Sequence, residues 1–202
     1  MVTQKDTRAR VVLLAGPSGA GKSRLAERLR TAHGWPIVNL DDFYKDVDDP
    51  SLPMHPSLGI ADWDDPRSWD GEGAVAALTA LIDEGRCEVP VYDISVSRRV
   101  SSTTATLPAE HLVLAEGIFA AELVAPLRAA GVLHSAWCVR NRPALTFVRR
   151  LARDLKEHRK PPRVLIRRGL ELMRAEPQVV ARASKRGARP ATAPEVEAAL
   201  RT

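Results

Sequence analysis

The sequence predicts an α/β fold in which helices cover both faces of a central parallel sheet. The alternation of two kinds of segment carries this prediction. Apolar, strand-like runs alternate with amphipathic, helix-like segments along most of the 202 residues, and parallel strands need such crossover helices to connect them. A hydrophobic content of 45% is enough for one packed core, so we expect a single domain over residues 1–202.

The expected elements follow from hydrophobic periodicity and from the residues that end helices. Gly34 and Gly85 follow two helical patterns and are typical helix stops. Residues 95–106 are polar and are expected to form a hairpin or a loop, and the tail after Pro177 is expected to be irregular up to residue 195. The expected strands are 11–15, 36–40, 88–94, 112–115 and 132–139, and the expected helices are 22–33, 73–84, 120–130, 143–158, 164–174 and 195–200.

Residues 16–23 read Gly-Pro-Ser-Gly-Ala-Gly-Lys-Ser, a complete G-x-x-x-x-G-K-[ST] phosphate loop between a strand and a helix. In such a loop, backbone amides and the first helical turn hold phosphate oxygens. We expect an exposed Lys22 to contact the outer phosphates and the Ser23 hydroxyl to ligate Mg²⁺. The motif therefore predicts a P-loop NTPase three-layer fold with ATP and Mg²⁺ as cofactors. The expected cofactor-binding residues are Gly16, Ser18, Gly19, Ala20, Gly21, Lys22, Ser23 and Arg24.

Carboxylates follow two of the expected strands. Asp41 and Asp42 come after strand 36–40, and Glu116 comes after strand 112–115. Ligands collect beyond the carboxyl ends of parallel strands, and a kinase needs one carboxylate as proton acceptor and another near Mg²⁺. The alternative for Asp41 and Asp42 is a solvated acidic turn without a ligand. The alternative for Glu116 is a glutamate that only caps the next helix. The expected metal ligands are Ser23, Asp41 and Glu116.

Charge is distributed unevenly along a chain whose net charge is +5. Residues 41–72 hold ten acidic and two basic residues, whereas residues 149–189 hold fourteen basic and four acidic ones. A basic second half is compatible with nucleic-acid binding, but it lacks the interleaved aromatics on which bases stack. We therefore favour a basic lid, residues 149–174, that folds over a triphosphate.

Three features predict a cytoplasmic protein without a membrane anchor. No run of 18 apolar residues is present, and the polar N-terminus leads directly into the first expected strand, so no signal peptide is expected. Cys87 and Cys138 are far apart and form no C-x-x-C pair, which is typical of a reduced compartment.

Further motifs along residues 10–160 resemble those of the uridine kinase (uridine–cytidine kinase) family, within a wider group that includes phosphoribulokinase and bacterial pantothenate kinase. The resemblance begins with the phosphate loop and combines segments that are each less specific alone. These segments are Asp41-Asp42-Phe43-Tyr44, Asp62-Trp63-Asp64-Asp65-Pro66 with Trp69-Asp70, Val89-Pro90-Val91-Tyr92-Asp93 with Arg98-Arg99, Ala115-Glu116-Gly117-Ile118, and Arg149-Arg150-Leu151-Ala152-Arg153-Asp154.

The resemblance implies roles for individual residues. Asp41 matches the base that activates a ribose 5′-hydroxyl, Asp64 the acid that binds the ribose 2′- and 3′-hydroxyls, and Glu116 the acid near Mg²⁺. Tyr92 matches an aromatic beside the nucleobase. The implied catalytic residues are Asp41, Lys22, Arg150 and Arg153, with Arg150 and Arg153 in the lid. The implied substrate-binding residues are Asp41, Tyr44, Asp64, Tyr92, Ser97, Arg99 and Arg150.

Three departures from the family pattern concern base reading, the lid and the C-terminus. Ser97 stands where the family has a base-contacting histidine, and His158-Arg159-Lys160 replaces the lid's Arg-Gly-Arg. The family's C-terminal strand is not recognisable in residues 183–190.

The resulting expectation is an ATP-dependent phosphotransferase acting on a small-molecule hydroxyl, foremost the 5′-hydroxyl of uridine or cytidine. Residues 41–110 would bind the acceptor, with a small β-hairpin as part of that site. Another small alcohol, such as a sugar, a pantothenate-like alcohol or a modified nucleoside, is the first alternative. The second alternative is a nucleotide-dependent regulator that binds nucleic acid. The sequence leaves open whether the protein forms a homo-oligomer.

Overall fold

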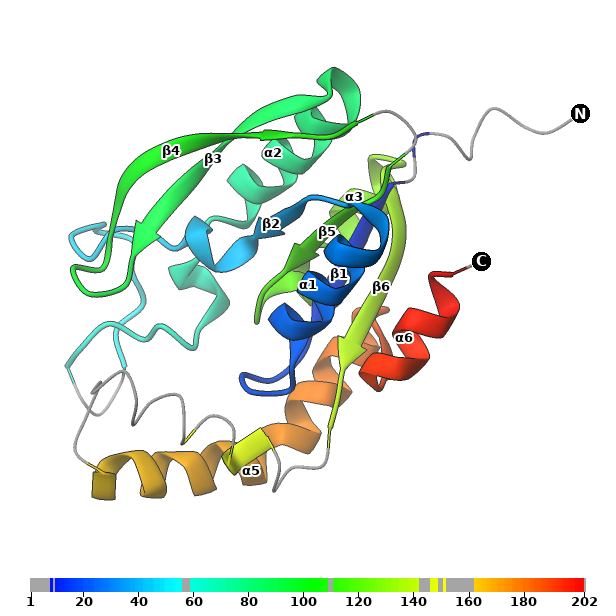
Figure 1. The fold of residues 1–202 in the computed structure, drawn as a ribbon. Coiled ribbons are helices and arrows are strands. Elements are labelled where there is room, and N and C mark those ends of the chain that lie inside the picture. The colour runs from blue at the N-terminus through cyan, green and yellow to red at the C-terminus, as the bar shows by residue number, and fades with distance from the viewer. Residues whose placement is uncertain are drawn as a thin grey trace, which may run out of the picture.

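The computed structural model describes residues 8, 10–55, 59–108, 111–141, 146–148, 151 and 162–201, without the side chains of 162–172 and 175. Within these residues, five parallel strands form one sheet in the order β2-β5-β1-β6-β7. The strands are β1 (Val11–Ala15), β2 (Ile37–Asn39), β5 (Val113–Glu116), β6 (Leu133–Val139) and β7 (Arg189–Ala191). Because all five run in one direction, their carboxyl ends meet at one edge of the sheet (Figure 1).

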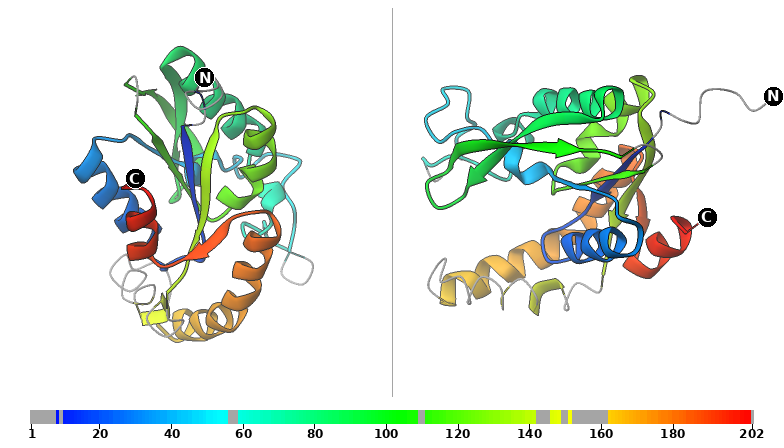
Figure 2. Two further views of the ribbon diagram at one scale, coloured as in Figure 1. Left: turned by 90° about the vertical axis from the view of Figure 1, so that its right-hand side faces the viewer. Right: turned by 45° about the horizontal axis from the view of Figure 1, so that its top comes forward.

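Helices cover both faces of this sheet, which confirms the predicted three-layer α/β arrangement. Helices α1 (Lys22–His33) and α6 (Ala193–Ala199) lie on one side, and α2 (Gly71–Glu84) and α3 (Val124–Ala129) lie on the other (Figure 2). Alternate residues of β1 divide between the two cores: Leu14 packs with Leu25 of α1, whereas Leu13 belongs to the cluster that contains Leu78 of α2. Because successive side chains of a strand point to opposite faces of the sheet, β1 contributes to the core on both faces.

A two-stranded antiparallel sheet extends from the α2 side of the molecule. It consists of β3 (Arg86–Asp93) and β4 (Arg98–Thr106), so the hairpin expected as one alternative for residues 95–106 is confirmed. Cys87 and Val89 of β3 and Ala105 of β4 pack against the main core. Short 3₁₀ turns, η1 (Leu40–Phe43), η2 (Pro66–Ser68) and η3 (Ala120–Leu123), connect the sheet with the surrounding elements.

The C-terminal part differs from the prediction in two places. One helix, α5 (Pro162–Lys185), continues through Pro177, where we expected the irregular tail to begin. Proline costs a helix one hydrogen bond, but Val180 and Ala183 beyond it pack on the core, and this packing keeps the chain helical. The second difference is β7, which pairs with β6 although its sequence, Arg-Pro-Ala, is not strand-like. The expected helix 143–158 lies almost wholly outside the described residues.

Other boundaries agree with the prediction to within two residues or so. The predicted helix 120–130 is divided into η3 and α3, and α2 begins two residues earlier than expected because the Asp70 side chain accepts a hydrogen bond from the Gly73 amide as its N-cap. No helix in the described part of the chain is both long and apolar enough to cross a membrane.

Candidate active site

The phosphate loop, residues 16–23, follows β1 and leads into α1, the context that its motif requires. Its glycines Gly16, Gly19 and Gly21 have φ angles of 131°, 87° and 101°, in the region that favours glycine. A Cβ atom on Gly16 would collide with the carbonyl oxygen of Val139, the last residue of β6. The loop therefore needs glycine both for its turns and for its close approach to the sheet.

Lys22 is buried, with 7% of its surface exposed, so the expectation of an exposed lysine is wrong. Its Nζ donates hydrogen bonds to the carbonyl oxygens of Gly16, at 2.9 Å, and of Pro17, at 3.3 Å. The loop curls around the ammonium group and solvates it with backbone carbonyls in place of water. A nucleotide phosphate has to compete with these carbonyls for the cation. Ser23 and Arg24, by contrast, are exposed.

Glu116 ends β5 and lies between the two neighbouring strands, opposite Leu14 of β1 and Asn39 of β2. Burial raises the pKa of its carboxyl above the usual value, and a hydrogen bond with the Ser23 hydroxyl and the nearby Lys22 cation partly offset that rise. Ser23 and Glu116, two of the three predicted metal ligands, therefore lie next to each other at one edge of the sheet.

The oxygen atoms of Ser23, Asp41 and Glu116 are hard ligands of the kind that Mg²⁺ prefers. The Asp41 carboxylate is close enough to raise the pKa of Glu116 electrostatically. Among the described residues, no group of three or more His, Cys, Asp or Glu side chains is arranged to hold a metal ion. Mg²⁺ commonly takes one or two carboxylates from a protein and its other ligands from phosphates and water, so this donor set fits a nucleotide-bound Mg²⁺.

The adjacent acids Asp41 and Asp42 face different neighbours. The η1 turn begins with the Asn39 side chain accepting a hydrogen bond from the Asp41 amide at 3.2 Å. Asp41 Oδ1 accepts a hydrogen bond from the Ile118 amide, at 3.2 Å, just beyond β5. Asp42 Oδ1 instead accepts one from the Tyr92 amide of the hairpin, at 3.3 Å, and burial raises the pKa of the Asp42 carboxyl. Asp41 thus lies at the sheet edge with the phosphate loop, whereas Asp42 anchors the hairpin.

Gly117 allows this position of Asp41. A Cβ atom there would lie 2.8 Å from Leu40 Cβ and 2.9 Å from Asp41 Oδ1. Since Leu40 is fully buried and cannot yield, Gly117→Ala should push η1 away from β5 and displace the Asp41 carboxylate. We expect kcat to fall about tenfold or more, because small misplacements of reacting groups have large effects on rate. Steady-state kinetics would measure this, and an unchanged kcat in a folded variant would contradict the role of the Gly117–Asp41 contact.

Aromatic rings surround Tyr44, which follows η1. Its ring centroid lies 5.7 Å from that of Trp63, 5.9 Å from that of Tyr92 and 6.0 Å from that of Phe119. The Tyr44 hydroxyl donates a hydrogen bond to the Trp63 carbonyl oxygen at 3.1 Å, and the Tyr92 hydroxyl donates one to the Lys45 carbonyl oxygen at 3.2 Å. These contacts join the β3–β4 hairpin, η1 and the loop that contains Trp63 into one wall.

Tyr44 also lies near both acids to which the resemblance assigns acceptor roles. Burial first, and then the Asp41 and Asp64 carboxylates, raise the pKa of Tyr44 well above its usual value. Asp41 and Asp64 therefore both lie near Tyr44. Phe119 was not among the residues selected from the sequence. An aromatic residue directly after the Glu116-Gly117-Ile118 segment was the available signal.

A cavity of about 310 Å³ opens beside the phosphate loop. Asp64 lines it together with the start of the loop, Ile118 and Phe119. Asp41 is not among the lining residues, but its carboxylate accepts a hydrogen bond from the amide of one of them, Ile118. Helix α5 forms another wall, which sequence reasoning did not foresee because the apolar and basic residues there were assigned to the tail. The lining consists of Gly16, Pro17, Ser18, Asp64, Pro66, Ile118, Phe119, Ala121, Glu122, Val179, Arg182, Ala183 and Arg186.

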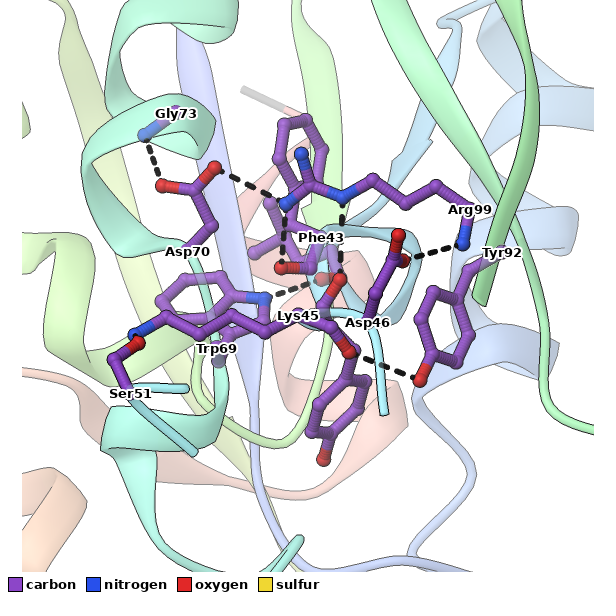
Figure 3. Close-up of polar contacts among 11 residues, drawn as sticks. Phe43, Lys45, Asp46, Ser51, Trp69, Asp70, Gly73, Tyr92 and Arg99 are labelled. Atoms are coloured by element: carbon purple, nitrogen blue, oxygen red, sulfur yellow. Dashed lines mark hydrogen bonds and ion pairs between the residues drawn. The ribbon is translucent and has the colours of Figure 1, made fainter. Parts of the chain in front are cut away.

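Arg99 of β4 is engaged with the backbone around η1 (Figure 3). Its guanidinium donates hydrogen bonds to the carbonyl oxygens of Phe43, at 3.3 Å, and Tyr44, at 3.2 Å, and lies 3.1 Å from Asp70 Oδ2. Its amide donates to Asp46 Oδ1 at 2.8 Å. We predicted Arg99 as a substrate-binding residue. That role stays a prediction, and from its contacts we infer in addition a positioning role, in which Arg99 fastens the hairpin to the turn that carries Asp41.

We therefore expect Arg99→Gln to lower the free energy of unfolding by about 1–2 kcal/mol, the range for hydrogen bonds to a charged group at a partly exposed site. The kcat should fall several-fold while the KM for ATP stays near the wild-type value. Arg98→Gln is a matched control, because Arg98 pairs only with the exposed Asp48 among the described residues, and such surface pairs contribute about 0–1 kcal/mol. Urea unfolding and steady-state kinetics measure both variants. If both lost the same free energy of unfolding and the same kcat, the positioning role of Arg99 would be contradicted.

Ser97 lies in the turn of the hairpin with a φ of 52°, the one positive value outside glycine in the described residues. Its hydroxyl forms a hydrogen bond with Tyr92 and a weaker one, 3.4 Å long, with the Ile94 carbonyl oxygen. Its own carbonyl oxygen accepts a hydrogen bond from the Val47 amide at 2.9 Å. Ser97 is thus next to Tyr92, as the resemblance implies, but on a strained backbone. The predicted lid arginines Arg150 and Arg153 lie outside the described residues.

Comparison with known proteins gives relatives over most of the chain. A uridine kinase of Deinococcus deserti is 30% identical over 167 residues, which are 81% of this chain and 77% of that protein. The chain belongs to the uridine kinase family. A uridine kinase of Limosilactobacillus reuteri is 26% identical over 78% of this chain and 70% of that protein. No family model matches the sequence.

Two other findings limit what membership alone implies. The chain is 29% identical to the inorganic pyrophosphatases TTM1 and TTM2 of Arabidopsis thaliana but spans only about a quarter of their length, 24% and 23%. A crystal structure described as a fructose transport system kinase of Silicibacter sp. TM1040 superposes with a TM-score of 0.64 at 18% identity, over 95% of this chain and 91% of that one. This likeness concerns the fold, in agreement with the P-loop kinase architecture.

Proposed function

We propose that this protein transfers the γ-phosphoryl group of ATP to a small-molecule hydroxyl, foremost the 5′-hydroxyl of a nucleoside such as uridine or cytidine. One observation carries the proposal. The Asp41 carboxylate accepts a hydrogen bond from the amide of Ile118, and Ile118 lines a cavity together with the phosphate loop and Asp64. Membership of the uridine kinase family supports the same reaction.

In this reaction the acceptor oxygen forms a bond to the γ-phosphorus while the bond to the β,γ-bridging oxygen breaks and ADP leaves. Asp41 would accept the proton of the attacking hydroxyl, and Asp64 would orient the acceptor through its ribose hydroxyls. Lys22 would leave its loop carbonyls to neutralise the outer phosphates. The work of the protein is therefore positioning and charge stabilisation.

Ser23, Asp41 and Glu116 would hold Mg²⁺, whose charge would neutralise phosphate oxygens. We also propose, as an extension, that residues 41–110 form the acceptor side and residues 149–174 a lid carrying Arg150 and Arg153, within one kinase domain. Closure of such a lid would exclude water and limit ATP hydrolysis.

An ATP-consumption screen over nucleosides, sugars and small alcohols tests the proposed reaction, with the phosphorylated product identified by mass spectrometry. We expect turnover with ribosides and its loss with 2′,3′-dideoxyuridine, which offers Asp64 no diol. Efficient use of the dideoxy acceptor would overturn the ribose assignment. ATP hydrolysis without any phosphorylated alcohol would overturn the kinase assignment.

A further inference from the structure

The side chain of Asn39, at the carboxyl end of β2, contacts both of the acids that follow it. Its Oδ1 atom accepts a hydrogen bond from the Asp41 amide at 3.2 Å and so forms the N-cap of η1. Burial raises the pKa of the Asp42 carboxyl, and hydrogen bonds with the Tyr92 amide and the Asn39 side chain partly offset that rise. The bond from Asn39 to Asp42 comes from its Nδ2 group, because a carboxylate only accepts. One amide side chain therefore holds the backbone of the first acid and the carboxylate of the second.

The two acids have separate partners on different elements. The Asp41 carboxylate accepts the Ile118 amide hydrogen just beyond β5, whereas the Asp42 carboxylate accepts the Tyr92 amide hydrogen on the hairpin. The η1 turn between these partners is only four residues long, and the first amides of such a turn have no partner within it. The bond to Asn39 supplies that partner and opposes any rotation of η1 that would carry either acid away from its own amide.

A purely structural explanation would be that Asn39 is an ordinary helix cap. Asparagine, aspartate and serine cap helices about equally well, so capping alone does not select an amide. In the β2–β5 pairing, Asn39 lies opposite Glu116, whose pKa is raised first by burial and also by the Asp41 and Asp42 carboxylates. An aspartate at position 39 would add a fourth carboxylate to this group, and a serine has a single hydroxyl for both contacts. Of the three capping residues, asparagine alone combines an acceptor, a separate donor and no charge.

We propose that Asn39 is a positioning residue of the phosphoryl-transfer site, which holds Asp41 in the place required for proton transfer and retains Asp42 at the hairpin. The inference rests on the proposed function, in which Asp41 is the proton acceptor. Asn39 acts through the two acids and not on the substrate itself. Gly117 provides the space for the Asp41 carboxylate, and Asn39 provides the hydrogen bond that fixes the Asp41 backbone.

Two substitutions at position 39 separate capping from its loss. Asn39→Ala removes both contacts, and we expect kcat to fall about tenfold with an unchanged KM for ATP, because small misplacements of a reacting group have large effects on rate. Asn39→Ser retains a capping oxygen and should restore kcat to within about threefold of wild type. A wild-type kcat in Asn39→Ala, or equal losses in both variants, would overturn the proposal.

Asp49→Ala is the matched control for the loss of this kind of bond. Asp49 Oδ1 accepts a hydrogen bond from the amide two residues along the chain, that of Ser51, at 2.8 Å, as Asn39 does from Asp41. Because Asp49 contacts neither of the two acids through this bond, its removal should leave kcat at the wild-type value. A loss of kcat as large as that in Asn39→Ala would show that the effect is not specific to η1 and would overturn the proposal.

Combination with Asp41→Asn distinguishes positioning from stability. In the wild-type background this substitution should cost about a hundredfold in kcat. In the Asn39→Ala background, where the acid is already displaced, it should cost about tenfold or less, because residues that act as a unit are not additive. A merely structural cap would lower the melting temperature and leave the hundredfold ratio unchanged, and that outcome would count against the positioning role.

Two backbone amides report on the acids without any turnover. The Ile118 amide bonds to Asp41 and the Tyr92 amide to Asp42, so their hydrogen-exchange rates, measured by NMR, follow the two contacts separately. Asn39→Ala should accelerate exchange at both amides, Asn39→Ser at Tyr92 alone, and Asp49→Ala at neither. If no alcohol is phosphorylated, the proposed function is wrong, and the positioning role is then judged by these amides. Unchanged exchange at Ile118 in Asn39→Ala would overturn it.

Discussion

Replacing Asp41 by asparagine should lower kcat by about a hundredfold or more, the usual contribution of a positioned general base. Asparagine keeps the size of the side chain and an oxygen that accepts the Ile118 amide hydrogen, so the geometry of η1 should persist. What is lost is the ability to take a proton from the attacking hydroxyl. Because that role belongs to the transition state, the KM for the acceptor should change little.

Asp42→Asn is the matched control for this experiment. It makes the same chemical change one residue along the chain, at a carboxylate whose oxygen accepts the Tyr92 amide hydrogen. We expect its kcat to remain within a few-fold of wild type, because the asparagine oxygen can still accept that bond. Steady-state kinetics with the best acceptor from the screen measures both variants. A large loss in Asp42→Asn together with near-normal Asp41→Asn would reverse the assignment of the two acids.

Lys22→Ala should likewise reduce turnover by about a hundredfold or more, because the developing phosphate charge loses a preorganised cation. The buried ammonium adds a second consequence: the carbonyl groups of Gly16 and Pro17 lose their donor, so the empty loop should become more mobile. Lys22→Met keeps the aliphatic stem and removes only the charge, and it separates loss of packing from loss of the cation.

Arg30→Ala is the control for Lys22, since it removes a cation from the far end of α1, where Arg30 pairs with the exposed Glu27. Its turnover should equal that of the wild type. Circular dichroism and thermal melting would establish that each variant is folded. Wild-type turnover in both Lys22 variants would exclude phosphoryl transfer at this loop.

Much of the nucleotide side of the site is encoded locally, and the sequence alone predicted it. The motif of residues 16–23 contains its own explanation, because each glycine meets a backbone demand within the loop. Gly34 and Gly85 end α1 and α2 with positive φ angles of 73° and 75°, as their positions after amphipathic patterns indicated. The apolar strands β1 and β5 were likewise predicted, since strands buried on both faces read as continuous apolar runs.

The acceptor side depends on contacts between distant segments, so in the sequence only the family resemblance, and not the residues themselves, assigned roles there. Asp41 and Asp42 are neighbours of identical chemistry, and only the packing of η1 between β5 and the hairpin gives them different partners. Arg99 is one of two adjacent arginines, and its guanidinium bonds to carbonyl oxygens more than fifty residues away, which no local pattern indicates.

The sequence by itself determined the class of fold and the phosphate loop, because strand alternation, glycine stops and the loop motif act over a few residues. Tertiary structure decided the rest of the site. The chain stays helical through Pro177 because Val180 and Ala183 pack on the core, and this brings Arg182 to the wall of the cavity that Asp64 also lines. Local propensity predicted irregular chain at this point, and the burial of apolar side chains outweighed it.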